Sequence, residues 1–380
     1  MVQRRPFPPF IQINKLLGTI AKMGDYTTAL SHFKKLQLLG FEGSCTPDVT
    51  TFNTLLNGLI LQDKAAEAME LFKKLTRNGD IEPDVVMYGT LITGLCKMGV
   101  AITAVGLLRI MEERGCKPNT IAYNVIIANL CKDRMVDDAI RLFIEMKEKG
   151  IPINVVTYNS LIHGLCSVGR WKEATRMLRE ILYTGIYPDV YTFNVLVVAL
   201  FKKGKAKEAE EVLEVMIERG VDPNVVTYNS LMDGYCLQGQ MDEAMRVFNK
   251  MVDMGVQPSN LSHNILISGY CKEMKIDEAM HLFREMPEKG FKPDVQTFST
   301  VLQGLFRVGR CAAAHELFDE MLVAGIIPST ITFGILLDGL CKNEGLLDEA
   351  KEFFVEMEQN GCFPNGCTYN VIIQGFLARK

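Results

Sequence analysis

An asparagine recurs along this chain at a constant interval, each time directly after an aromatic ring or a histidine. The interval is 35 residues across one set: Asn124, Asn159, Asn194, Asn229 and Asn264. A carboxamide can donate and accept hydrogen bonds at once, which suits it to recognising a polar group. A fixed period of 20–50 residues indicates a stacked array of repeats rather than one globular core.

The same slot continues in both directions. It holds Ser299 and Gly334 at the same spacing, and Asn370 after 36 residues; towards the N-terminus it holds Gly89, Asn53 and Asn14. We number each repeat so that this slot is position 5. Repeats then begin at residues 10, 49, 85, 120, 155, 190, 225, 260, 295 and 330, with a partial repeat at 366–380 and an N-terminal extension at 1–9. Because the chain stops partway through a repeat, we expect its ends to be clipped.

The elements that must position this slot are two helices per repeat. In the repeat at 155, Tyr158, Leu161 and Leu165 lie at i, i+3 and i+7, the spacing of one helical face. Position 20 is alanine in the first nine repeats, as at Ala174, and a small residue there lets the two helices approach closely. Position 31 is glycine in the same nine repeats, as at Gly185, which favours a C-terminal helix cap with positive φ.

Such a helical hairpin cannot bury its own apolar faces, so neighbouring hairpins must stack on it. We therefore expect an all-α fold, a right-handed α-solenoid of about ten hairpin repeats. The hydrophobic fraction of 48% suits a stacked core. We expect no membrane association, because no apolar run reaches the ~18 residues that a membrane span needs. We find no secretory signal peptide, and residues 1–9 are too short for a convincing transit peptide.

The cysteines and histidines give no sign of metal or catalytic chemistry. Six of the eleven cysteines share position 12, where two other repeats carry phenylalanine, so we interpret them as core thiols: Cys96, Cys131, Cys166, Cys236, Cys271 and Cys341. His263 stands where other repeats carry Tyr or Phe, and we expect it to pack in their place. No nucleophile elbow, zinc motif or phosphate-binding glycine loop is present. We expect no enzyme, no cofactor, no metal and no small-molecule substrate.

The residue pattern of the repeats resembles that of a known family. Residues 225–236, VVTYNSLMDGYC, and the repeats at 155 and 295 resemble the pentatricopeptide repeat, and the resemblance covers residues 10–380. The array is similar to the P-type, without an editing extension. Residues 161–171, LIHGLCSVGRW, resemble the restorer-of-fertility-like subgroup of plant organelles.

The resemblance implies a function. In this family each repeat reads one RNA base, and position 5 chooses the base together with the last residue of the repeat. Carried over, the pairs are Asn14 with Asp48, Asn53 with Asp84, Gly89 with Asn119, Asn124 with Asn154, Asn159 with Asp189, Asn194 with Asn224, Asn229 with Ser259, Asn264 with Asp294, Ser299 with Ser329, and Gly334 with Asn365. Position 2 sandwiches the base: Ile11, Thr50, Val86, Ile121, Val156, Tyr191, Val226, Leu261, Gln296 and Ile331.

The choice of base follows from donors and acceptors. Asp only accepts, which suits the N3–H of uracil, whereas Ser or Asn can donate to the bare N3 of cytosine. Small residues at position 5 leave room for a purine. In the family's orientation the expected target is U-U-?-Y-U-Y-C-U-R-?, with the bases at Gly89 and Gly334 open. An asparagine near a helix start often acts as a cap; we favour ligand contact because position 5 lies inside the apolar spacing.

The net charge of −4 is unusual for a nucleic-acid binder. The acids concentrate on the second helices, however, and position 13 of the first helices often carries a cation, which would meet phosphates: Lys22, Lys97, Lys132, Lys202, Lys272, Arg307 and Lys342. The alternative for these residues is ordinary solubilising charge.

Three functions are compatible with such an array. The leading hypothesis is sequence-specific binding of single-stranded RNA, with accessory proteins as further partners. By the resemblance the protein would act on transcript processing, stability or translation in mitochondria, with plastids second. The alternatives are a protein-interaction scaffold like the tetratricopeptide repeats, whose 34-residue period and signature are absent, and the targeting half of an enzyme.

Overall fold

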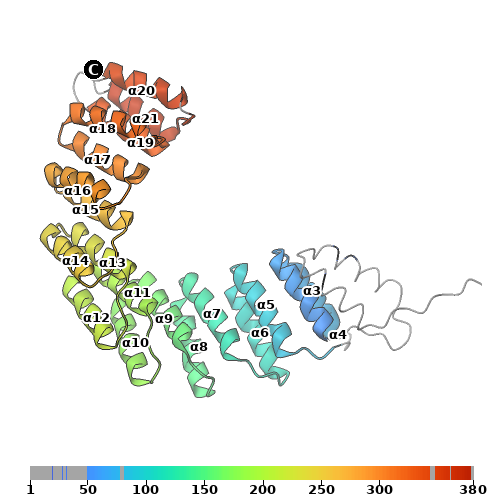
Figure 1. Cartoon of the computed structure of the whole chain (residues 1–380). Coiled ribbons are helices and arrows are strands. Elements are labelled where there is room, and N and C mark those ends of the chain that lie inside the picture. The colour runs from blue at the N-terminus through green and yellow to red at the C-terminus, as the bar shows by residue number, and fades with distance from the viewer. Residues whose placement is uncertain are drawn as a thin grey trace, which may run out of the picture. The chain divides into compact units, whose positions relative to one another are not determined.

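The computed structural model describes residues 49–77, 81–342, 347–359 and 361–377, with Thr19, Thr28 and Ser31 as single positions before them. The chain divides into two compact units, Met1–Pro188 and Asp189–Lys380. Each unit is a row of helical hairpins stacked in chain order (Figure 1). The predicted site residues of the first repeat lie outside the described residues: Ile11, Asn14, Lys22 and Asp48.

The first unit contains four described hairpins. They are α3 (Val49–Leu61) with α4 (Ala65–Arg77), α5 (Val85–Lys97) with α6 (Ala101–Glu113), α7 (Thr120–Lys132) with α8 (Val136–Glu148), and α9 (Val155–Ser167) with α10 (Trp171–Tyr183). Every first helix begins at the predicted first residue of its repeat, so the predicted register is confirmed here.

The second unit continues the same pattern. Its hairpins are α11 (Val190–Phe201) with α12 (Ala206–Glu218), α13 (Val225–Leu237) with α14 (Met241–Asp253), α15 (Asn260–Lys272) with α16 (Ile276–Glu288), α17 (Val295–Arg307) with α18 (Cys311–Val323), and α19 (Thr330–Lys342) with α20 (Leu347–Gln359). The helix α21 (Gly366–Leu377) belongs to the partial repeat.

Two layers of helices run through each unit. A first helix contacts its own second helix, the second helix of the preceding hairpin and the first helices on either side, as α15 contacts α13, α14, α16 and α17. The core lies between the layers. Ala174 at position 20 is fully buried, and Gly185 ends its helix with a φ of +75°, as the sequence predicted. The predicted all-helical hairpin architecture is confirmed within each unit.

The first helices approach each other closely at a position that the sequence did not single out. Position 10 is a glycine in most repeats, and a Cβ on Gly164 would lie only 2.5 Å from Sγ of Cys131 in the preceding repeat. Gly234 would meet the ring of Phe201 in the same way. A glycine at position 10 and a residue at position 12 therefore interlock between neighbouring first helices.

This packing explains the cysteine slot. Cys96, Cys131, Cys236 and Cys271 are buried, which confirms the core interpretation for them, and Cys166 and Cys341 are half-buried. Burial raises the pKa of the Cys96 and Cys131 thiols to about 12, so both stay protonated at neutral pH. His263 is also buried, and its ring packs 5.4 Å from that of Phe248, so the expectation that it replaces an aromatic ring is confirmed.

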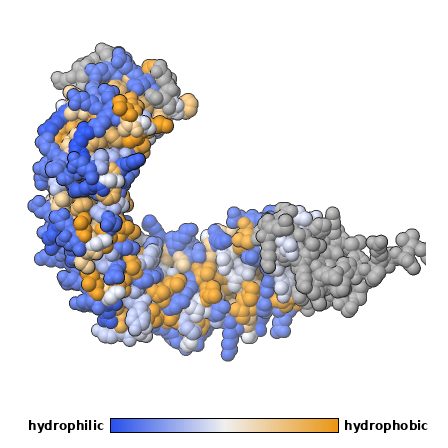
Figure 2. Space-filling model, viewed as in Figure 1, coloured by the Kyte–Doolittle hydropathy of each residue, from blue (hydrophilic) through white to orange (hydrophobic). Residues whose placement is uncertain are grey.

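The described helices are short, and none of them combines the length and apolar character needed to span a bilayer. On the face shown in Figure 2, hydrophilic and apolar side chains are interspersed along both units.

Candidate nucleic-acid interface

Position 5 is the fifth residue of each first helix, so it lies in the layer formed by the first helices. Asn124, Asn229 and Asn264 are over nine-tenths buried, which is unusual for a carboxamide. Because each first helix begins four residues earlier, position 5 does not cap it. The capping alternative for position 5 is therefore excluded for the described repeats.

The cap is instead the last residue of each repeat, a role that was not assigned to it from the sequence. Asp84 accepts a hydrogen bond from the backbone N–H of Met87 at 2.8 Å, and Asp294 accepts one from Thr297 at 2.9 Å. Ser259 caps α15 in the same manner, accepting from Ser262 N–H. Asp, Asn and Ser are the residues that best satisfy the free N–H groups at a helix start. The last residue of each repeat therefore caps the next first helix, which explains why it is Asp, Asn or Ser.

The structure brings several predicted pairs together. The amide Nδ2 of Asn124 donates to Oδ1 of Asn154 at 3.0 Å, and Asn53 Nδ2 lies 3.3 Å from both carboxylate oxygens of Asp84. In these two pairs position 5 and the last residue, 30 or 31 residues apart in sequence, form one polar surface between neighbouring first helices.

Other predicted pairs differ. Asn194 Nδ2 lies 3.5 Å from Oδ1 of Asn224, a weak contact. Gly89 and Gly334 have no side chain to offer. Asn159 belongs to the first unit and Asp189 to the second, so that pair remains a prediction.

Position 2 carries an exposed side chain in all nine predicted repeats that the structure describes. Most of these side chains are apolar: Ile121 is 69% exposed, Ile331 72% and Leu261 59%. A large apolar side chain that recurs exposed at one register of most repeats is not used for packing. These residues flank the polar surface made by position 5 and the last residue, and they are available to contact the flat faces of a ligand.

The cations at position 13 are also exposed in the described repeats: Lys97, Lys132, Lys202, Lys272, Arg307 and Lys342. Of these six, only Lys342 has an ion pair within the described part of the chain, with Asp338 at 2.7 Å. Lys202 is the cap residue just beyond α11. The other side chains are therefore free to meet an anionic partner.

Several acids of the second helices pair with bases on the same layer. Arg109 pairs with Glu145 of the next repeat, and Arg246 lies 2.9 Å from Glu210 of the preceding one. The Arg109 guanidinium lowers the pKa of Glu145 to about 2. Pairing on the outer layer explains how a chain of net charge −4 can keep exposed cations on its first helices.

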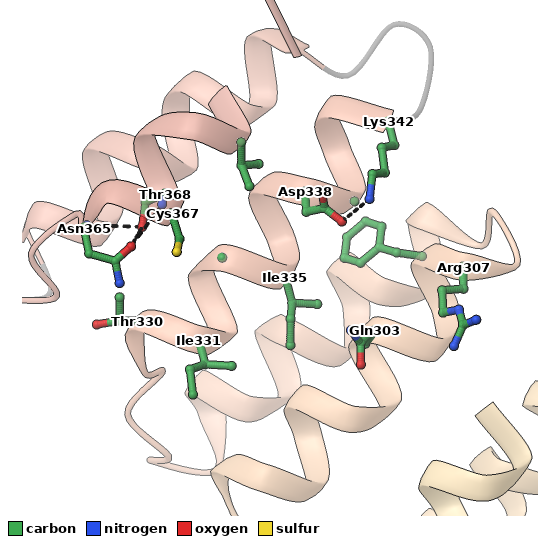
Figure 3. A pocket seen from close by; sticks show the side chains of 14 residues that line it. Gln303, Arg307, Thr330, Ile331, Ile335, Asp338, Lys342, Asn365, Cys367 and Thr368 are labelled. Carbon is green, nitrogen blue, oxygen red and sulfur yellow. Dashed lines mark hydrogen bonds and ion pairs between the residues drawn. The ribbon is translucent and has the colours of Figure 1, made fainter. Parts of the chain in front are cut away.

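A hollow opens at one of the two repeats that lack a position-5 side chain. A cavity of about 600 Å³ surrounds Gly334, where an added Cβ would meet no atom within 4 Å. Figure 3 shows Ile331 and Lys342 of α19, Arg307 of α17 and Asn365 at the start of α21 around this cavity. An apolar position-2 residue, a capping amide and two position-13 cations therefore surround one space.

A third polar position was not identified from the sequence. Position 3 of the following repeat carries a buried hydroxyl in several repeats, and Thr157 Oγ1 lies 2.7 Å from Oδ1 of Asn124. The recurrent Asn-x-x-Thr and Asp-x-x-Thr patterns could have revealed it as a capping box. In α9, α11, α13, α15 and α17 this box is complete.

The geometry defines a class of protein: an array of helical hairpins whose first helices present an exposed position-2 residue and, in most repeats, a polar pair and a cation. The family comparison agrees with it. The PPR repeat family matches residues 47–97, 83–125, 118–167, 153–202, 193–236, 223–272, 261–307, 298–342 and 343–378. The chain belongs to the PPR repeat family.

Curated relatives match over a short stretch. Two mitochondrial pentatricopeptide repeat-containing proteins of Arabidopsis thaliana, At1g62680 and At1g62914, are each 39% identical over 57 residues, which is 15% of this chain. The matched stretch spans 10% of the length of each relative.

Solved structures are similar to this chain over most of its length. The pentatricopeptide repeat protein PPR10 from maize is 22% identical, with 98% of this chain and 62% of that chain covered and a TM-score of 0.49. PPR10 in complex with an 18-nt psaJ RNA element is 24% identical, with 97% and 57% covered and a TM-score of 0.49. Yeast Rmd9p in complex with a 16-nt target RNA is 13% identical, with 95% and 83% covered and a TM-score of 0.46.

Proposed function

We propose that this protein binds single-stranded RNA in a sequence-specific manner, with one repeat for each base. The observation that carries the proposal is the recurrence, on every described first helix of a full repeat, of an exposed position-2 residue beside position 5 and the capping residue. Apolar side chains on both sides of a base provide stacking that tolerates any sequence. Hydrogen bonds from the polar pair then discriminate between bases.

The exposed cations support the same function. RNA binding gains much of its free energy when cationic side chains replace the counterions of phosphates. Lys97 and Lys132 are unpaired in the described part of the chain and stand at the same position of neighbouring repeats, α5 and α7. A backbone that passes along the first helices would meet one cation per repeat where position 13 is basic.

The proposed target is U-U-?-Y-U-Y-C-U-R-?, read from 5′ to 3′. The uracils are assigned to repeats that end in Asp, and the cytosine to the repeat of Asn229 and Ser259. The bases at the Gly89 and Gly334 repeats stay open.

The site of action that we propose is the mitochondrion, with the plastid as the alternative. The names of both Arabidopsis relatives carry that location. The protein would act by occupying a transcript, so that it protects an end from nucleases or changes access for processing or translation. No catalytic step is assigned to it.

RNA that co-purifies with a tagged form of the protein, sequenced after nuclease trimming, tests this proposal. The expected result is enrichment of short footprints that contain the proposed motif, with weaker recovery of the corresponding DNA. A matched variant, in which position 5 of three neighbouring repeats is alanine (Asn194, Asn229 and Asn264), should lose those footprints while it stays folded. Equal recovery of unrelated RNAs by both proteins would contradict sequence-specific reading.

A further inference from the structure

The buried hydroxyl at position 3 contacts position 5 of the preceding repeat in four places. Thr157, Thr227 and Ser262 each place a hydroxyl oxygen 2.7 Å from the Oδ1 atom of an asparagine at position 5, and Thr332 lies 2.9 Å from Ser299 Oγ. The members of each pair lie 33 residues apart in sequence. A repeated contact this short, in a buried place, fixes the orientation of the carboxamide.

The direction of the hydrogen bond follows from the capping box. The backbone N–H of Asn224 donates to Thr227 Oγ1 at 3.2 Å, so the hydroxyl already acts as an acceptor there. Its own proton is left to donate, and the nearest acceptor is Oδ1 of Asn194 at 2.7 Å, compared with 3.2 Å for Oδ1 of Asn224. The amide oxygen of Asn194 is therefore held by Thr227, and its NH₂ group points towards the capping residue, 3.5 Å from Oδ1 of Asn224.

The contact is different where the capping residue is aspartate. Thr297 Oγ1 donates to Asp294 Oδ1 at 2.9 Å, and the buried Oδ1 of Asn264 has no hydrogen-bond partner in the described part of the chain. Asn53 shows the same orphaned oxygen, and there the position-3 residue of the next repeat is Met87, which has no hydroxyl. The position-5 oxygen therefore lacks a partner in two situations: where the position-3 hydroxyl bonds to an aspartate cap instead, and where position 3 carries no hydroxyl.

We propose that the position-3 hydroxyl is a specificity-determining positioning residue for base reading, an inference that rests on the proposed function. Where the cap is Asn or Ser, the hydroxyl holds the position-5 amide with its NH₂ donor facing the base. That donor matches the bare N3 of cytosine and opposes the N3–H of uracil. Where the cap is Asp, the carboxylate takes the hydroxyl proton, the position-5 amide loses its bond to position 3, and the carboxylate can accept from the N3–H of uracil.

The test uses the repeat of Asn194, assigned to the sixth base. Thr227→Val keeps the shape of the side chain and removes the hydroxyl, and Thr227→Ser keeps the hydroxyl, as Ser262 does naturally. Affinities are measured for U-U-A-U-U-C-C-U-A-A and U-U-A-U-U-U-C-U-A-A, which differ at the sixth base, and for U-U-A-U-U-U-C-C-A-A, which differs from the second RNA at the eighth base. Thr297→Val is the matched control, because it breaks a capping box of the same kind without a bond to position 5.

We expect the wild-type protein and Thr227→Ser to prefer C at the sixth base. Thr227→Val should lower the C-to-U ratio by roughly three- to ten-fold, the size of one net hydrogen bond. Thr297→Val should leave the preference at the eighth base unchanged, while the melting temperatures of both valine variants fall alike.

Two failures can be told apart. If the wild-type protein binds neither RNA above background, the proposed function is wrong. If it binds with base discrimination but the C-to-U ratio at the sixth base is the same in Thr227→Val, or if wild type shows no C preference there, the positioning role is overturned and RNA binding stands.

Discussion

Replacing Ser259 by aspartate should switch the base read by the seventh repeat from cytosine to uracil. Ser259 caps α15, and aspartate caps α17 in the same geometry through Asp294, so the substitution preserves the helix start. In the wild-type repeat the Ser259 hydroxyl can donate to the bare N3 of cytosine. A carboxylate can only accept hydrogen bonds, so it cannot bond to the N3 acceptor of cytosine. Uracil instead offers its N3–H as a donor to the carboxylate.

The magnitude follows from the contacts at this position. Ser262 Oγ donates to Oδ1 of Asn229 at 2.7 Å, and an aspartate at 259 would compete for that proton as Asp294 does for the proton of Thr297. Both effects favour uracil. Because Ser259 is only half-buried, solvent weakens them, and we expect a swing of about 1–3 kcal/mol, roughly 5- to 150-fold in the ratio of dissociation constants.

Fluorescence anisotropy with U-U-A-U-U-U-C-U-A-A and its seventh-base U variant measures the swing. Ser259→Thr, which keeps the hydroxyl, is the control and should retain the preference for C. Preferences at the sixth and eighth bases should not change, since each repeat reads its own base. An unchanged C-to-U ratio in a folded Ser259→Asp protein would refute the assignment of this base to Asn229 and Ser259.

Three further predictions concern stability and electrostatics. Ala174→Leu should overpack a fully buried contact and cost about 1–3 kcal/mol, seen as a lower melting temperature; a wild-type value would contradict the close approach of α9 and α10. Replacing three position-13 lysines by alanine, at Lys97, Lys132 and Lys202, should weaken the binding of all single-stranded RNAs alike. It should also reduce the slope of log K against log salt concentration by about 0.7 per lost phosphate contact. An unchanged slope would mean that these lysines only keep the protein soluble. Glu145→Gln should cost about 1 kcal/mol at neutral pH, a modest value because the partner Arg109 is partly exposed. Since the pKa of Glu145 is lowered to about 2, wild type should lose this advantage as pH falls from about 4.5 towards 2, and a constant difference in urea titrations would exclude the ion pair as its source.

Much of the fold could be predicted because its determinants are local. Helical spacing, a capping residue and a glycine with positive φ act within a few residues, and they recur in register, so the predicted starts of all the described first helices are correct. The buried Ala174 and the aromatic role of His263 follow from the same register. The last residues of the repeats were singled out for base choice through the family resemblance, but their capping role, itself a local signal, was overlooked.

What the sequence determined by itself is the period and the helical hairpin, because each depends on residue type at a fixed position, whereas the residues proposed to read bases came from the family resemblance. The tertiary structure decided which of these residues touch. The close packing of first helices through glycines such as Gly164 brings position 5 against a hydroxyl 33 residues later. Thr227 bonds to position 5 of the preceding repeat, at Asn194, whereas Thr297 bonds to its own cap, Asp294, and only the packed arrangement of neighbouring repeats shows which partner each hydroxyl takes.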